Sequence, residues 1–296
     1  MEITVVKHMG PSLAILAAVA AAVSLSAQTP LIEQGRAAIS RGETDAAIDI
    51  LEKAVAQSPK NAEAHFTLGN AYATKVQANG IFAAAKYASR IKEEWEKAVA
   101  LDPKYVEARF GLVQVYAGAP GIMGGSYDKA FEQAKEIKAI DPILGHRAYG
   151  LIYTQQKKPD LAKKEYTDAI REQPTSAKAH GYLGQHFANV EKNYTAAFAE
   201  FETALKLDPN YMPVYYHLGR TASLANTNFA RGEEALKKYV ATTPKENEPA
   251  LANAHYRLGM IYEKEGKTAE AKQSYQTALR LNPSLKEASE ALKRVS

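Results

Sequence analysis

The sequence predicts an all-α protein, a right-handed α-solenoid of about seven helix-turn-helix repeats that ends in a C-terminal capping helix. Two recurrent phrases predict this fold class. A short phrase such as ALKLDP leads into most of the prolines that recur every 32–44 residues, at Pro59, Pro103, Pro142, Pro174, Pro209, Pro244 and Pro283. A second phrase, similar to LGNAY, recurs upstream of five of them, at 68–72, 149–153, 183–187, 218–222 and 258–262. Such a period is typical of arrays whose helical units stack to bury a shared core.

Composition excludes several classes of protein. Of the 296 residues, 46% are hydrophobic and 24% are charged, so the chain has enough apolar side chains for a core. Its length exceeds that of one ordinary domain, which has about 100–200 residues. The absence of cysteine excludes disulfides, thiolate metal sites and cysteine nucleophiles. The net charge is +4 and no block of like charges occurs, so we expect no nucleic-acid partner.

Residues 1–27 have the features of a secretory signal peptide. Lys7 gives a basic start, an apolar run follows from Leu13 to Val23, and small residues lead to Ser26 and Ala27. The run is shorter than the roughly 20 apolar residues that span a membrane. We therefore expect cleavage after residue 26 or 27, a periplasmic or secreted protein, and no membrane contact after cleavage. The alternative is an uncleaved N-terminal anchor.

Residues 28–296 are expected to form the solenoid. The phrases divide it into repeats at 28–61, 62–105, 106–142, 143–176, 177–211, 212–246 and 252–285. Within the repeats an alanine recurs twelve residues before the proline, at Ala47, Ala130, Ala162, Ala197 and Ala271. The proline ends the second helix of a repeat because its ring removes a backbone donor and disfavours helix at the preceding residue. Residues 286–296 carry Ala288, Leu292 and Val295 on one stripe, which predicts a helix that caps the last repeat.

Two insertions interrupt the period, at 73–90 and at 118–126. The first predicts a long second helix from about Ile81 to Ala100, started after Gly80. The second is rich in glycine, and a glycine-rich loop before a helix can hold an anion on free backbone amides. No strand precedes it and no Gly-Lys-Ser/Thr follows, so it is not a P-loop. An ordinary hairpin loop and an anion or small-ligand contact both remain open.

These phrases, with their spaced alanines and prolines, resemble the tetratricopeptide repeat family over nearly all of residues 28–296. The resemblance implies two antiparallel helices in each repeat, with a glycine at repeat position eight that lets the first helix approach the second. That position holds Gly35, Gly69, Gly150, Gly184, Gly219 and Gly259. Opposite it, the resemblance places large side chains of the second helix, which are Leu51, Trp95, Tyr166, Phe201 and Tyr275.

The resemblance also implies a concave wall lined by the first helix of each repeat. Carried over position by position, its aromatic members are Phe66, Phe110, Tyr182, Tyr216 and Tyr256, its amides Asn70, Gln114 and Gln185, and its cations Arg147, Arg220 and Arg257. Arginine suits carboxylates, and positive charge dominates residues 143–296, so an acidic partner would prefer that half. The carboxylate clamp of chaperone-binding family members is incomplete, since Asn70 matches its asparagine but Phe66 replaces its lysine.

No catalytic, metal or cofactor site is expected. The sequence contains no HExxH, nucleophile-elbow or dinucleotide-binding motif. His65, His180 and His255 share repeat position four, which indicates packing and not metal binding. We therefore expect a non-enzymatic scaffold for an unidentified protein or peptide partner. The alternatives are a small-ligand or anion binder that uses the two insertions, and a subunit of a cell-envelope assembly.

Overall fold

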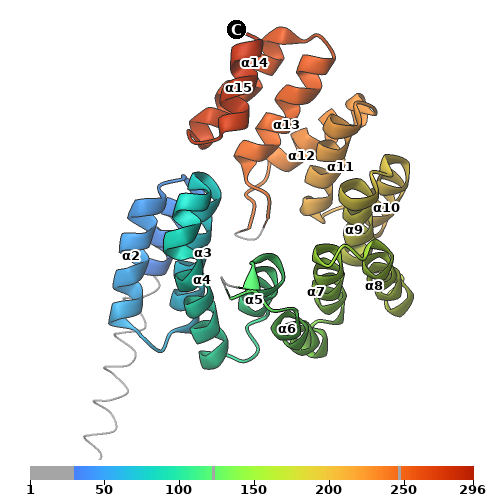
Figure 1. Cartoon of the computed structure of the whole chain (residues 1–296). Helices are drawn as coiled ribbons and strands as arrows, with labels where there is room; N and C mark the ends of the chain where they lie inside the picture. The colour runs from blue at the N-terminus through green and yellow to red at the C-terminus, as the bar shows by residue number, and fades with distance from the viewer. Residues whose placement is uncertain (1–29, 122–123, 246–247) are drawn as a thin grey trace, which may run out of the picture.

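The computed structural model describes residues 30–121, 124–245 and 248–296, and these are helices and their connections, without strands (Figure 1). The α-solenoid expected from the sequence is confirmed. The expected signal peptide at 1–27 lies outside the described residues. No helix within the described ranges is long and apolar enough to cross a membrane.

The helices follow one another as antiparallel pairs. Residues 30–40 are helical and pack on α2 (Thr44–Gln57). The further pairs are α3 (Ala62–Asn79) with α4 (Ile81–Leu101), α5 (Val106–Gly118) with α6 (Tyr127–Ile140), α7 (Pro142–Gln155) with α8 (Pro159–Glu172), α9 (Ala177–His186) with α10 (Tyr194–Leu207), α11 (Met212–Ala225) with α12 (Phe229–Val240), and α13 (Leu251–Lys264) with α14 (Thr268–Leu281). A π-helix, η2 (Phe187–Glu191), continues α9, and α15 (Lys286–Arg294) follows the last pair.

A glycine of the first helix and a large side chain of the second close each pair except α5–α6. A Cβ added at Gly184 would lie 2.6 Å from the Phe201 ring, so only glycine allows the observed approach of α9 and α10. The same contact recurs as Gly35–Leu51, Gly69–Trp95, Gly150–Tyr166, Gly219–Leu236 and Gly259–Tyr275. The structure therefore shows the contact that the glycine pattern predicts.

The prolines do not all act as expected. Pro142 follows the end of α6 at Ile140 by two residues, as Pro103 follows α4 and Pro209 follows α10, but it is also the first residue of α7, where a missing N–H costs nothing. Asp141 caps α7 by accepting a hydrogen bond from the Leu144 amide over 2.9 Å. Pro244 lies four residues beyond the end of α12, in the connection to α13. The first helix of the fourth repeat thus follows the third repeat with a one-residue link.

The first insertion lengthens both helices of its pair. The expected long second helix is found as α4, but α3 also runs on to Asn79, which was not expected from the sequence. Gly80, with a φ of 68°, makes the turn between them. Tyr72 and Tyr87 stack at 5.1 Å between ring centroids and hold the extension together.

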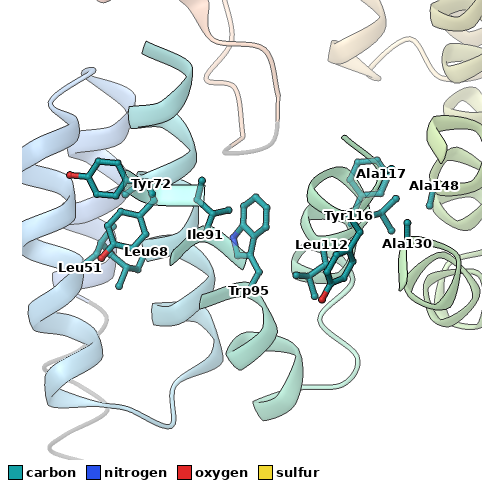
Figure 2. Close-up of a cluster of buried hydrophobic side chains, with 14 of the residues drawn as sticks. Leu51, Leu68, Tyr72, Ile91, Trp95, Leu112, Tyr116, Ala117, Ala130 and Ala148 are labelled. Atoms are coloured by element: carbon teal, nitrogen blue, oxygen red, sulfur yellow. The ribbon is translucent and has the colours of Figure 1, made fainter. Parts of the chain in front are cut away.

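The core divides into two large clusters of buried side chains. The first reaches from the helix at residues 30–40 to α7 and contains Trp95, which lies between α3 and α5 where Gly69 and Gly111 leave room for its indole (Figure 2). The second reaches from α9 to α15 and contains Phe201 and Tyr275. Smaller clusters join α7, α8 and α9. Neither large cluster extends across the contact between α7 and α9, so the core is least continuous there.

The pairs follow a curved path (Figure 1). Helices α7 and α9 lie on the inner side of the curve, and α8 and α10 lie on the outer side. The curvature brings the two ends of the solenoid together, because Gly42 before α2 lies beside Asn282 after α14. A pocket of about 310 Å³ at this junction is lined by Thr44, Lys75 and Ser284, among others.

Candidate binding surface on the inner helices

Three expected groove residues from successive first helices form one stack. The Arg147 guanidinium of α7 lies 4.6 Å from the ring centroid of Phe110 in α5 and 4.8 Å from that of Tyr182 in α9. Each contact is a cation–π interaction, and together they fix the orientation of the guanidinium. Because the rings are its neighbours, the guanidinium N–H groups are the part of Arg147 that remains for hydrogen bonding.

A pocket of about 200 Å³ lies beside this stack. It is lined by Arg147 and residues of α7, by Tyr182, Gln185 and His186 of α9, and by Asn189 and Val190 of η2. The π-helix has a wider turn than an α-helix, and it ends at Lys192, whose φ is 56°. Its extra residue places Asn189 at the pocket wall. The repeat pattern of the sequence did not predict that His186 and Asn189 line the site. The only sequence feature that could have indicated it is that the fifth repeat is one residue longer than the fourth.

Arg220 of α11 extends the positive surface beyond the pocket. Its guanidinium donates a hydrogen bond over 2.6 Å to the Asn189 side-chain oxygen. Burial and the neighbouring Arg257 charge both lower the pKa of Arg220. Burial, Arg220 and Arg147 together lower the pKa of His217 to about 3. Arg147, Arg220, Arg257 and His217 therefore belong to one electrostatic neighbourhood, and His217 is neutral within it.

None of these three arginines forms an ion pair with a carboxylate in the part of the chain that the structure describes. Other arginines do: Arg231 lies 2.7 Å from Glu202, and Arg294 lies 3.0 Å from Glu263. The Nε atom of Arg257 is buried without a hydrogen-bond partner, and its Nη1 contacts the Met260 sulfur at 3.2 Å.

Two expected wall residues are largely buried. Tyr216 is 7% exposed and packs on Tyr239 at 5.6 Å between ring centroids, so it belongs to the core and offers little surface to a partner. Phe110 is 9% exposed because Arg147 covers its ring. The expectation that both line an open wall is corrected.

The remaining expected residues lie along the same set of helices. On α3, Phe66 is half-buried against Tyr105 at 4.8 Å between centroids, and Asn70 is also half-buried. On α5, Gln114 is exposed. On α13, the Arg257 guanidinium lies 5.0 Å from the Tyr256 ring centroid, and both side chains are partly exposed. The structure thus brings together Arg147, Tyr182, Gln185 and Arg220, with Phe66 and Asn70 at a separate place on α3.

In the glycine-rich insertion, the described amides just before α6 are already hydrogen-bonded within the loop. The amides of Gly124, Gly125 and Ser126 each donate to a carbonyl of residues 116–121, over 2.8–3.1 Å. The Ser126 hydroxyl caps α6 by accepting from the Lys129 amide. These groups therefore serve the loop itself.

Histidines at repeat position four connect the loop before the first helix to the second helix. His65 bonds to the Pro59 carbonyl through Nε2 at 3.0 Å and to Glu94 through Nδ1. His180 contacts the Pro174 carbonyl and Glu200 in the same way. Within the described ranges, no group of three or more His, Cys, Asp or Glu side chains is placed to hold a metal ion.

Family profiles match three segments of the chain. The profile described as tetratricopeptide repeat matches residues 252–285, a second of that description matches 149–211, and one described as TPR repeat matches 35–76. Mouse (Mus musculus) N-alpha-acetyltransferase 25, the NatB auxiliary subunit, is 27% identical over 158 residues, which cover 50% of this chain and 16% of that protein. The chain thus spans a small part of this relative.

Solved structures of other proteins share the fold. The human IFIT1 dimer with m7Gppp-AAAA superposes with a TM-score of 0.57 at 18% identity, covering 86% of this chain and 58% of that one. The APC/C hetero-tetramer Cut9-Hcn1 superposes with a TM-score of 0.51 at 18% identity, covering 87% and 47%. These likenesses show the fold, and the three matched segments, at 35–76, 149–211 and 252–285, lead to the conclusion that the chain carries tetratricopeptide repeats.

Proposed function

We propose that the chain is an exported, non-enzymatic scaffold that holds a segment of another protein along its inner helices. The observation that carries this proposal is the surface formed by Arg147, Tyr182, Gln185 and Arg220 beside an open pocket. Aromatic and arginine side chains are the residue types that most often dominate binding energy at protein interfaces. Repeat arrays expose such surfaces because each unit contacts only its neighbours.

The similar proteins agree with an interaction role. One is named as an auxiliary subunit and another was solved as part of a hetero-tetramer. Export rests on the features of residues 1–27, and it places the partner in the periplasm or outside the cell. Mass spectrometry of the mature N-terminus would distinguish cleavage after residue 26 or 27 from a retained anchor.

Replacing Tyr182 and Tyr256 together with alanine is expected to weaken partner capture by about 30-fold or more. Loss of a hot-spot side chain costs about 2 kcal/mol, and each 1.4 kcal/mol is tenfold in affinity. Both rings are partly exposed on first helices, so the fold should survive the change. The measurement is affinity capture from the envelope fraction of the native host, quantified against the unmodified chain.

The matched control is Tyr127→Ala. Tyr127 is an exposed tyrosine on α6, a second helix, and its loss should leave capture unchanged. Equal capture by the double variant and by the control would contradict the proposal that inner helices bind the partner.

A further inference from the structure

The guanidinium of Arg147 is prepared for a ligand with two acceptor oxygens. Phe110 and Tyr182 contact it at 4.6 and 4.8 Å, and no carboxylate of the described residues pairs with it. Guanidinium N–H groups lie in one plane, and their fork matches a carboxylate through two parallel hydrogen bonds. Because these contacts already order the Arg147 side chain, less conformational entropy is lost when a ligand binds to it.

Arg220 and Arg257 continue this surface with positive charge that the described chain does not neutralise. Burial, together with the repulsion between the two charges, lowers the pKa of Arg220. The buried Arg257 Nε has no hydrogen-bond partner. A nearby anion would offset the like-charge repulsion.

We propose that the segment bound on this surface is acidic, and that its aspartate or glutamate carboxylates pair with Arg147, Arg220 and Arg257. This inference rests on the proposed function and names the chemistry of its partner. The pocket beside Arg147 receives the first carboxylate, with Gln185 and Asn189 as its other polar neighbours. The excess of positive charge in residues 143–296 attracts the same segment at longer range.

An acidic peptide fits better than a nucleic acid. Single-stranded nucleic acids are held largely by stacking of bases on exposed aromatic or arginine faces. Here the Arg147 faces are engaged by Phe110 and Tyr182, and Tyr216 is buried. What remains accessible at Arg147 is the hydrogen-bonding edge, so this arginine offers no free face on which a base could stack. A single-stranded RNA is therefore the competing ligand in the test.

The test measures fluorescence anisotropy of labelled peptides with the full chain. Three probes are compared: a peptide of alternating glutamate and alanine, its glutamine counterpart, and a single-stranded oligouridine. We expect the glutamate peptide to bind at least about 10-fold more tightly than the glutamine peptide, because hydrogen bonds to a carboxylate are stronger than those to a neutral amide. Its affinity should fall as salt is added.

The variant R147Q/R220Q is expected to weaken glutamate-peptide binding by about 10- to 100-fold. The control is R280Q, because Arg280 is exposed on α14, outside this surface, and its loss should change nothing. Arg147→Lys keeps the positive charge but loses the forked guanidinium, so its affinity for the glutamate peptide should lie between those of R147Q/R220Q and R280Q. The comparison of glutamate with glutamine peptide on the unmodified chain does not depend on the folding of any variant.

Equal binding of the glutamate and glutamine peptides, or no binding of either, would overturn the acidic assignment. Tighter binding of oligouridine that R147Q/R220Q abolishes would replace it with a nucleic-acid surface. The proposed function is tested separately: if protein capture depends on Tyr182 and Tyr256 but R147Q/R220Q captures equally well, the groove stands and only the acidic chemistry is wrong.

Discussion

Replacing Phe201 with alanine is expected to lower the free energy of unfolding by about 3–5 kcal/mol. The ring is fully buried and fills the space that Gly184 leaves between α9 and α10. Its removal loses the burial of a large apolar side chain and opens a cavity that stiff neighbouring helices cannot close. Urea denaturation followed by far-UV circular dichroism measures the change, and Tyr127→Ala, an exposed aromatic, should stay within about 0.5 kcal/mol.

The same contact can be tested from its other side with Gly184→Val. A side chain at Gly184 would overlap the Phe201 ring, so this change should cost about 1–3 kcal/mol in the unmodified chain. In the Phe201→Ala background the cavity accepts the valine, and the cost should largely disappear. Equal costs in both backgrounds would mean that the two residues are not in contact.

Replacing His217 with phenylalanine is expected to make the chain more resistant to acid. The folded-state pKa of His217 is about 3 against an ordinary 6.5, because burial and the charges of Arg220 and Arg147 oppose protonation. Between these values the unfolded chain binds the proton and the folded chain does not, so stability rises with pH in this window. The part of the stability that depends on a neutral His217 is fully present above about pH 6.5 and is lost as the pH falls.

The effect should amount to about 1–2 kcal/mol between neutral pH and about pH 5, allowing for the partial exposure of the ring. Denaturant titrations of both chains at the two pH values measure it. Other buried histidines contribute equally to both chains, so the difference isolates His217. If acidification costs the two chains the same stability, His217 does not have the lowered pKa.

The fold could be predicted because the recurrent residues make contacts within a single helix pair. Glycine at position eight and a ring or leucine opposite it form one contact, so their joint recurrence is enough to identify a helix pair from the amino-acid sequence. The long α4 followed from Gly80 and an uninterrupted stretch of helix formers. Pro142 follows the end of α6 as predicted, but its second role as the first residue of α7 was not predicted, because proline is tolerated both after one helix and at the start of the next.

The binding surface could be predicted only in part, because a repeat position fixes a helix face and not the exposure of a side chain. Phe66, Phe110, Arg147, Tyr216 and Tyr256 all hold position five. Yet Arg147 covers Phe110, Tyr239 packs on Tyr216, and Tyr256 remains partly exposed. These outcomes depend on the neighbouring repeat. The π-helix that brings Asn189 to the pocket depends likewise on how α9 meets α10.

Site-specific photocrosslinking in the native host tests the central claim most directly. A photoreactive amino acid at Gln185, on the inner helix α9 beside the pocket, is compared with one at Leu161, which is 42% exposed on the outer helix α8. If the inner helices bind a segment of another protein, Gln185 yields a defined protein adduct and Leu161 does not. Adducts from Leu161 alone, or from neither position, would contradict the account.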